Sequence, residues 1–191
     1  MKISFGRKIP KIRCQILEKE TGKFTPATVY EIDCKDEADF LEIKRLDRRW
    51  HFKSDIAKNM EQKHAVQTYL KQKSNLSFYA IQDKNNELVG LAQTKTVNGI
   101  TDINYITTKP RNEYKYVGQT LVAAIGKEAL KKGNTQLTIT TSIDEAVDFY
   151  RKKCGFKKYG KYILRMNPEQ IQKSIDNVEE RTESQFINLK G

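Results

Sequence analysis

One short stretch, Lys115–Thr120, constrains the fold more than any other part of the chain. It follows an extended run, Ile100–Thr108, and precedes a segment with helical periodicity, Leu121–Lys132. A strand, a loop that contains glycine and a helix start together present backbone N–H groups to an anion. Gly118 allows the backbone and a phosphate to approach closely, and Lys115 adds a cation. The stretch therefore predicts an anion site, although many such junctions carry a glycine and bind nothing.

The flanking sequence predicts strands and helices in alternation around this junction. Alternating apolar residues predict a hairpin over residues 11–35, with its turn at Glu20–Lys23. Asn98-Gly99 predicts a second tight turn between two strands. The other predicted elements are helices over 36–50 and from Ser54-Asp55 to Leu70, strands over Leu76–Gln82, Glu87–Thr96, Ile100–Thr108 and Gln136–Thr141, a helix that stops at Gly155, and a strand over Phe156–Met166.

Capping signals mark two further helix starts. Ser142 and Glu145 have the spacing of a capping box, which predicts the helix that runs to Gly155. Asn167-Pro168 predicts the start of a last helix, because proline is favoured at the first helical position. No regular element is predicted from Arg181 onward.

Length and composition indicate a globular chain with one sizeable core. The chain has 191 residues, of which 38% are hydrophobic, and no apolar run is long enough to span a bilayer. We therefore expect a cytoplasmic protein without a membrane partner. The three cysteines are odd in number and widely separated, which favours free thiols and argues against a zinc site.

The formal net charge of +11 is the unusual value in the composition. Two clusters contribute strongly: Lys44–Lys53, which also contains Trp50 and Phe52, and Arg151–Arg165, which holds seven cations and no acid. Such surfaces attract nucleic acids, acidic proteins or polyphosphate ligands. A solvated basic face that only aids solubility explains the same pattern equally well.

A second motif lies thirty residues after the first one. Ala146, Tyr150 and Gly155-Phe156 mark the end of the predicted helix and the turn into the next strand. Together with Lys115–Thr120 and the order of elements, this pattern resembles the GCN5-related N-acetyltransferase (GNAT) superfamily over about residues 26–166. The family's loop reads Q/R-x-x-G-x-G/A, so Thr120 departs from it at the last position. The family's second motif reads A-x-x-x-Y-x-x-x-G-F, which has one residue fewer between Tyr and Gly than this chain has between Tyr150 and Gly155. Three residues before its Ala the family commonly has an Asn, and this chain has Ile143 at that position.

The resemblance implies an α+β fold: a mixed, mostly antiparallel sheet flanked by helices, with an N-terminal hairpin and a C-terminal helix. It implies one acetyltransferase domain over residues 1–167, followed by a C-terminal helix and tail over 168–191. It also implies acetyl-CoA as co-substrate and a primary amine on a small molecule or protein as acceptor. The residues implied for cofactor binding are Ile106, Thr107, Thr108, Lys115, Tyr116, Val117, Gly118, Gln119, Thr120 and Tyr150.

Two residues are candidates for catalysis. By the resemblance, Tyr150 is the general acid that protonates the departing thiolate; without the motif, a core tyrosine with a satisfied hydroxyl is the simpler reading. Families often place a Glu on the central strand, but Ile100–Thr108 has none. Asp102 is then the best candidate for a base, unless it is only an exposed carboxylate and a water relay or a low-pKa amine suffices.

Three functions remain open from the sequence. The first is an N-acetyltransferase whose amine acceptor is unknown. The second is a basic nucleic-acid-binding protein, for which the Lys44–Lys53 cluster is the motive. The third is a GNAT scaffold that binds CoA without turnover and acts through protein contacts. If Arg45, Arg48, Arg49 and Lys53 guide an acidic acceptor, reversing two of them to Glu should raise the KM of that acceptor and flatten its salt dependence.

Overall fold

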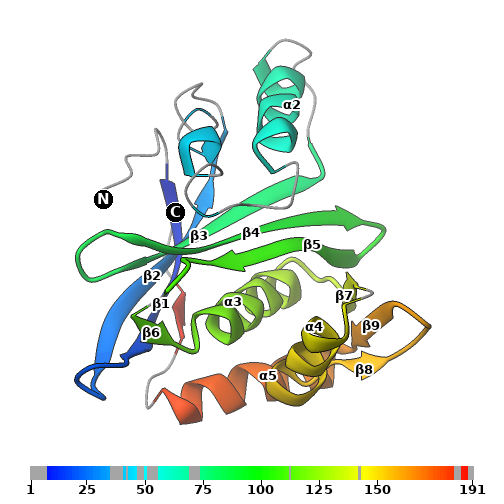
Figure 1. Ribbon diagram of the computed structural model, residues 1–191. Coiled ribbons are helices and arrows are strands. Elements are labelled where there is room, and N and C mark those ends of the chain that lie inside the picture. Colours follow the sequence, from blue (N-terminus) through cyan, green and yellow to red (C-terminus); the bar gives the residue numbers. More distant parts are fainter. Residues whose placement is uncertain are drawn as a thin grey trace.

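The computed structural model shows one large sheet with helices on both faces (Figure 1). The described residues are 8–34, 41, 43–46, 50, 56–68, 74–111, 113–141, 143–182 and 186–188. Among them, ten strands form one sheet, in the order β10-β1-β2-β3-β4-β5-β7-β9-β8, with β6 pairing with β1 outside that order. The sheet is antiparallel except where β5 pairs with β7. This confirms the predicted mixed, mostly antiparallel α+β class.

The first half of the sheet is built from hairpins. β1 (Lys8–Glu18) and β2 (Phe24–Ile32) form the predicted N-terminal hairpin, and Gly22 in its turn has φ +65°, which glycine adopts without strain. β3 (Leu76–Asp83), β4 (Leu88–Val97) and β5 (Ile100–Thr108) form the predicted meander. Asn98 and Gly99 both have positive φ between β4 and β5, as a two-residue hairpin turn requires.

One face of the sheet is covered by α3 (Val117–Lys131) and α5 (Pro168–Arg181), which pack on each other. A Cβ on Gly126 would lie 2.7 Å from Cγ2 of Ile171, so only glycine allows α3 and α5 to approach this closely. Pro168 and the Asn167–Gln170 capping box start α5 as predicted. The two helices and the strands they cover share one hydrophobic core.

The opposite face is covered by α2 (Ile56–Thr68), which Figure 1 shows above the sheet. Ile56 and Met60 pack there with Phe78 and Leu91 from the sheet. Residues 41, 43–46 and 50 are helical, within the predicted helix over 36–50. Most of the Lys44–Lys53 cluster, including Arg48, Arg49 and Lys53, lies outside the described residues.

The starts of α3 and of α4 (Asp144–Asp148) differ from the prediction. α3 begins at Val117 and not at Leu121, so the predicted loop supplies the first turn of the helix. α4 continues directly into a π-helical turn, η1 (Phe149–Lys153). Ile143 is the N-cap of α4 and makes no side-chain cap bond; Ser142, the predicted cap, lies outside the described residues.

The predicted single strand Phe156–Met166 is wrong. It is a hairpin of two short strands, β8 (Lys157–Lys158) and β9 (Ile163–Met166). The backbone turns at Gly160, where the N–H groups of Tyr159 and Gly160 both donate to the carbonyl of Ile163. β9 pairs with β7 (Gln136–Thr140), so β8 forms the outer edge of the sheet.

Two very short strands were not predicted. β6 (Tyr114–Lys115) and β10 (Ile187–Asn188) both pair with the outer edge of β1, at Leu17-Glu18 and Ile12-Arg13. Phe186, just before β10, is buried in the core shared by α3 and α5. No helix among the described residues is long and apolar enough to cross a membrane.

Candidate active site

The site begins where two parallel strands separate. β5 pairs with β7 only from Ile100 to Ile103, while β5 continues to Thr108. The register between β4 and β5 shifts between Ile103 and Tyr105, which marks a β-bulge. Beyond Ile103, no strand pairs with this edge of β5 in the described part of the chain. The backbone groups of residues 106–108 on that edge can therefore bond to a ligand that lies between the strands.

The start of α3 provides the second wall of the site. Tyr116 is its N-cap, with φ 68°, and no side chain caps the helix. The N–H of Thr120 donates to the carbonyl of Tyr116 at 2.8 Å. The preceding N–H groups, of Val117, Gly118 and Gln119, have no acceptor within the helix, because an α-helix leaves its first turn of donors unpaired. Together with the positive end of the helix dipole, they offer a geometry that suits an anion.

The loop before α3 is held in place from two sides. The pairing of β6 with β1 fixes it to the N-terminal hairpin, and the N–H of Lys19 donates to the carbonyl of Glu113 at 2.7 Å. On the other side, the hydroxyl of Tyr114 donates to Oδ2 of Asp83 at 2.8 Å. Burial, together with the Asp83 carboxylate, raises the pKa of Tyr114, so this phenol stays protonated and keeps the bond.

Gly90 of β4 sets how closely α3 approaches the sheet. A Cβ built there would lie 2.9 Å from side-chain carbons of Ile81, Val117 and Leu121. Real Cβ atoms essentially never come this close to a neighbour. The missing side chain therefore lets the first turn of α3 dock against β4.

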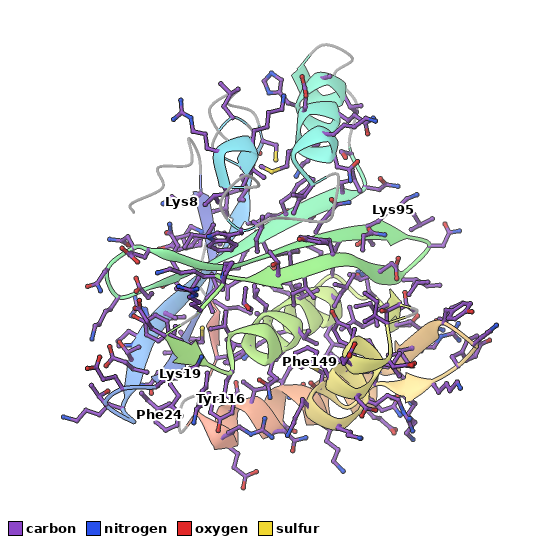
Figure 2. The ribbon with its side chains drawn as sticks, in the orientation of Figure 1. Lys8, Lys19, Phe24, Lys95, Tyr116 and Phe149 are labelled. Carbon is purple, nitrogen blue, oxygen red and sulfur yellow. The ribbon has the colours of Figure 1, made fainter. Side chains whose placement is uncertain are left out.

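These elements enclose one cavity of about 790 Å³. Figure 2 shows three of its residues, Lys19, Tyr116 and Phe149, which come from three different parts of the chain. Cations outnumber acids in its lining, with Lys19, Lys109 and Arg111 against Glu145. The lining residues are Lys19, Ile106, Thr107, Thr108, Lys109, Pro110, Arg111, Tyr114, Tyr116, Val117, Gly118, Gln119, Ile143, Glu145, Ala146, Phe149 and Tyr150.

Tyr150 lies in the π-helical turn η1, directly after the end of α4. Its side chain is buried, with edge-to-face contacts to Phe149 (5.1 Å) and Phe156 (5.7 Å) between ring centroids. Its hydroxyl has no hydrogen-bond partner among the described residues, although the residue lines the cavity. A tyrosine kept only for the core would be expected to satisfy its hydroxyl. Burial, and next the charge of Cys154, raise the pKa of Tyr150, so the phenol is neutral.

The π-helical turn explains the unusual spacing of the second motif. A π-turn accommodates one more residue than an α-turn, and the chain has one residue more between Tyr150 and Gly155 than the GNAT motif. The turn absorbs that residue at Phe149–Lys153. Tyr150 thereby keeps its place beside the cavity while Gly155 and Phe156 still lead into β8.

Eight of the residues predicted for the site line this cavity, and three do not. The eight are Ile106, Thr107, Thr108, Tyr116, Val117, Gly118, Gln119 and Tyr150. Lys115 is exposed in β6, and Thr120 is completely buried on the inner side of α3. Asp102 lies at the far end of β5, where it accepts hydrogen bonds from Thr138 (2.7 Å) and Asn104 (3.1 Å). The structure therefore does not bring Asp102 into the cavity.

The sequence prediction missed lining residues that depend on the fold. Lys19 comes from the turn of the N-terminal hairpin, and only the pairing of β1 with β6 brings it to the cavity. Phe149 precedes Tyr150, and its ring lies over Gly118: a Cβ there would be 3.0 Å from Cζ of Phe149. Adjacency to Tyr150 was the one signal in the sequence that could have indicated Phe149.

Thr120 offers a test of the helix start that is independent of any ligand. Its hydroxyl is buried and has no hydrogen-bond partner among the described residues. Such a group costs on the order of 1–2 kcal/mol. Replacing Thr120 by Val exchanges the hydroxyl for a methyl of similar size. We expect the free energy of unfolding to rise by about 1 kcal/mol, with cofactor affinity unchanged. Denaturant titration measures the free energy of unfolding, and titration calorimetry measures the affinity for the cofactor. A less stable variant would mean that the hydroxyl has a partner.

Comparison with known proteins identifies the family. A sequence profile described as "Acetyltransferase (GNAT) domain" matches residues 42–177. The chain belongs to the GNAT family of acetyltransferases. This membership confirms the resemblance and the predicted enzyme class, an N-acyltransferase of the GNAT type. A search of curated proteins finds no match to the sequence.

Solved structures of this family share the fold of the chain at low sequence identity. The ribosomal-protein-S18-alanine N-acetyltransferase from Escherichia coli aligns with a TM-score of 0.56 and 16% identity, over 74% of this chain and 93% of that one. Spermidine N-acetyltransferase from Vibrio cholerae, in complex with CoA and spermine, aligns with a TM-score of 0.59 and 13% identity, over 76% and 98%. PaiA N-acetyltransferase from Thermoplasma acidophilum, in complex with CoA, aligns with a TM-score of 0.50 and 18% identity, over 74% and 98%.

Proposed function

We propose that the chain transfers the acetyl group of acetyl-CoA to a primary amine. One observation carries this proposal: a single cavity is lined by the first residues of α3, by the end of β5 that no strand pairs with in the described part of the chain, and by Tyr150. Each of these three parts suits a different part of an acyl-CoA. Two of the solved structures with this fold contain CoA, which is consistent with the proposal.

The pyrophosphate would bind at the N–H groups of Val117, Gly118 and Gln119. These donors are fixed by the helix, so they need no rearrangement to meet the negative charge. Lys19 and Arg111 add positive charge at the same cavity and would attract the phosphates. Lys109 also lines the cavity, and its ammonium pairs with the Glu87 carboxylate at 3.3 Å.

The thioester would lie along the open edge of β5. A backbone N–H from residues 106–108 can donate to the carbonyl oxygen as that oxygen gains charge in the transition state. The amine nitrogen attacks the carbonyl carbon, the carbon–sulfur bond breaks, and the electron pair leaves with the sulfur. The nitrogen loses one proton as the amide forms, and the released thiolate sulfur gains one proton to give the free thiol of CoA, so the reaction of a neutral amine neither consumes nor releases protons overall.

Tyr150 would stabilise the departing sulfur. Its raised pKa keeps the phenol protonated at neutral pH, whereas a free thiol has a pKa of about 8.5. Complete proton transfer from this phenol to the thiolate is therefore uphill, and a hydrogen bond to the developing charge is the favoured role. The group that accepts the amine proton stays open, because Asp102 lies outside the cavity and both of its oxygens already accept hydrogen bonds.

The test is a CoA-release assay with a panel of amines, such as spermidine and peptides with free N-termini. We expect saturable binding of acetyl-CoA and release of free thiol with at least one acceptor. A thiol reagent suits this chain, because its three cysteines are buried and burial raises the pKa of Cys14 and Cys154 to about 12. Tight binding without thiol release for every acceptor would support the non-catalytic scaffold instead.

A further inference from the structure

A basic and aromatic surface remains unused by the proposed reaction. It lies on the β8–β9 hairpin, the outer edge of the sheet in Figure 1. We call it the hairpin patch and define it by six residues: Lys157, Lys158, Tyr159, Lys161, Tyr162 and Arg165. Five of the six are exposed, and Arg165 is half-buried.

The charge of the hairpin patch is uniform. Its four cations fall within nine residues that contain no acid. Arg151, Lys152 and Lys153 extend the same run at the preceding helix end, where Lys152 pairs with the carboxylate of Asp148. None of the four patch cations makes an ion pair among the described residues. A surface of this kind attracts polyanions.

The two tyrosines distinguish this patch from a purely solvated basic face. Tyr159 is 64% exposed and Tyr162 is 44% exposed, although both rings could contribute to a core. The guanidinium of Arg165 stacks on the ring of Tyr159 at 3.4 Å from the centroid, which fixes the ring and leaves much of it open to solvent. The ammonium of Lys161 lies 5.0 Å from the centroid of Tyr162. Each exposed ring thus has a cation beside it.

We propose that the hairpin patch binds single-stranded nucleic acid. Its cations would contact phosphates, and the rings of Tyr159 and Tyr162 would stack on unpaired bases, the combination that single-strand binders use. A duplex hides the faces of its bases, so it would use the cations alone. An acidic protein segment would likewise neutralise the cations but has no use for two exposed rings. A polyamine would be repelled.

The location of the patch connects it to the cavity. Ile143 lines the main cavity and also a second hollow, which it shares with Thr140, Thr141 and Tyr162. A strand bound at Tyr162 would therefore lie beside the site of the proposed acetyl transfer. The binding itself does not depend on that reaction and can be measured without acetyl-CoA.

The experiment measures fluorescence anisotropy of a labelled twelve-nucleotide RNA of mixed sequence, over a range of salt concentrations. Four phosphate contacts predict that log Kd changes with log salt with a slope of about 3. The double variant Lys158→Gln with Lys161→Gln should weaken binding and lower that slope by about 1.4. Tyr159→Ala with Tyr162→Ala should weaken binding roughly 10-fold or more and leave the slope unchanged.

Controls separate the patch from net charge and from folding. Lys23→Gln with Lys58→Gln removes two exposed lysines from the β1–β2 turn and from α2, and should leave RNA affinity nearly unchanged. Tyr159→Phe with Tyr162→Phe keeps both rings and should bind like the unmodified protein. Equal losses in the patch and control lysine variants would overturn the proposal. The proposal would also be overturned if duplex RNA or a poly-glutamate peptide bound as tightly as the single-stranded RNA and the tyrosine-to-alanine variant bound that RNA with unchanged affinity.

Discussion

Replacing Gly118 by Val should weaken acetyl-CoA binding on the order of 100-fold, about 2.7 kcal/mol. Gly118 is the second residue of α3, in the turn whose N–H groups we propose to bind the pyrophosphate. A branched side chain there would occupy the space through which a phosphate reaches those donors. Isothermal titration with acetyl-CoA measures the effect. If Gly118→Val binds as tightly as the unmodified protein, the pyrophosphate does not lie at this helix start.

The structure supplies a second reason for a small residue at this position, and the two reasons can be separated. A Cβ on Gly118 would lie 3.0 Å from Cζ of Phe149, so a larger side chain also displaces that ring. Phe149→Ala removes the ring and serves as the reference. The double variant combines Gly118→Val with Phe149→Ala. If displacement of the ring is the whole cause of the loss, this double variant will bind acetyl-CoA like Phe149→Ala alone. If phosphate access is the cause, the double variant will bind about 100-fold more weakly than this reference.

A truncated ligand gives a matched control. Acetyl-pantetheine carries the thioester but no pyrophosphate, so it should bind weakly and respond little to Gly118→Val. An equal loss for both ligands would indicate that the variant deforms the whole cavity. Thermal unfolding of the same variants reports whether α3 still docks on β4 at Gly90.

The sequence predicted the parts of the site that lie in continuous segments. The helix start at Gly118 and the tyrosine at 150 each sit in a local pattern, and local spacing places them on a loop and a helix. Their common cavity follows from the order of strands that the GNAT resemblance implied. Asp102 shows the limit of this reasoning. It lies on β5, whose other end lines the cavity, but in the part of β5 that pairs with β7. The alternation of side chains along a strand predicts which face a residue occupies, but it cannot predict where two neighbouring strands separate.

The missing parts of the prediction depend on contacts between distant segments. β6 and β10 are two residues long, so neither contains enough residues for a periodic pattern, and both exist because β1 offers an open edge. Lys19 lines the cavity through the same pairing. The π-helical turn was visible only as one residue too many between Tyr150 and Gly155, and sequence alone could not say how the chain absorbs it.

Replacing Tyr150 by Phe should lower turnover by up to about 100-fold while acetyl-CoA affinity stays nearly unchanged. The variant removes only the hydroxyl, which has no partner among the described residues, and it keeps the ring contacts with Phe149 and Phe156. Stability should therefore be maintained, and the loss should appear in kcat and not in the dissociation constant. Steady-state kinetics, titration calorimetry and thermal unfolding measure these three quantities on the same preparation.

The pH profile adds a readout that a purely structural tyrosine would not affect. Because burial raises the pKa of Tyr150 above the usual value of about 10, the phenol stays protonated as the pH rises. Its donor is therefore not lost between pH 8 and 10, and turnover of the unmodified protein should not fall there from ionisation of Tyr150. The ratio of turnover between the unmodified protein and Tyr150→Phe should stay constant over this range. A ratio that falls towards one by pH 10 would mean that the phenol ionises in this range and that burial does not keep it protonated. A ratio of one at every pH would mean that its hydrogen does not stabilise the departing sulfur. Loss of stability with turnover per folded molecule preserved would instead assign Tyr150 to the core alone.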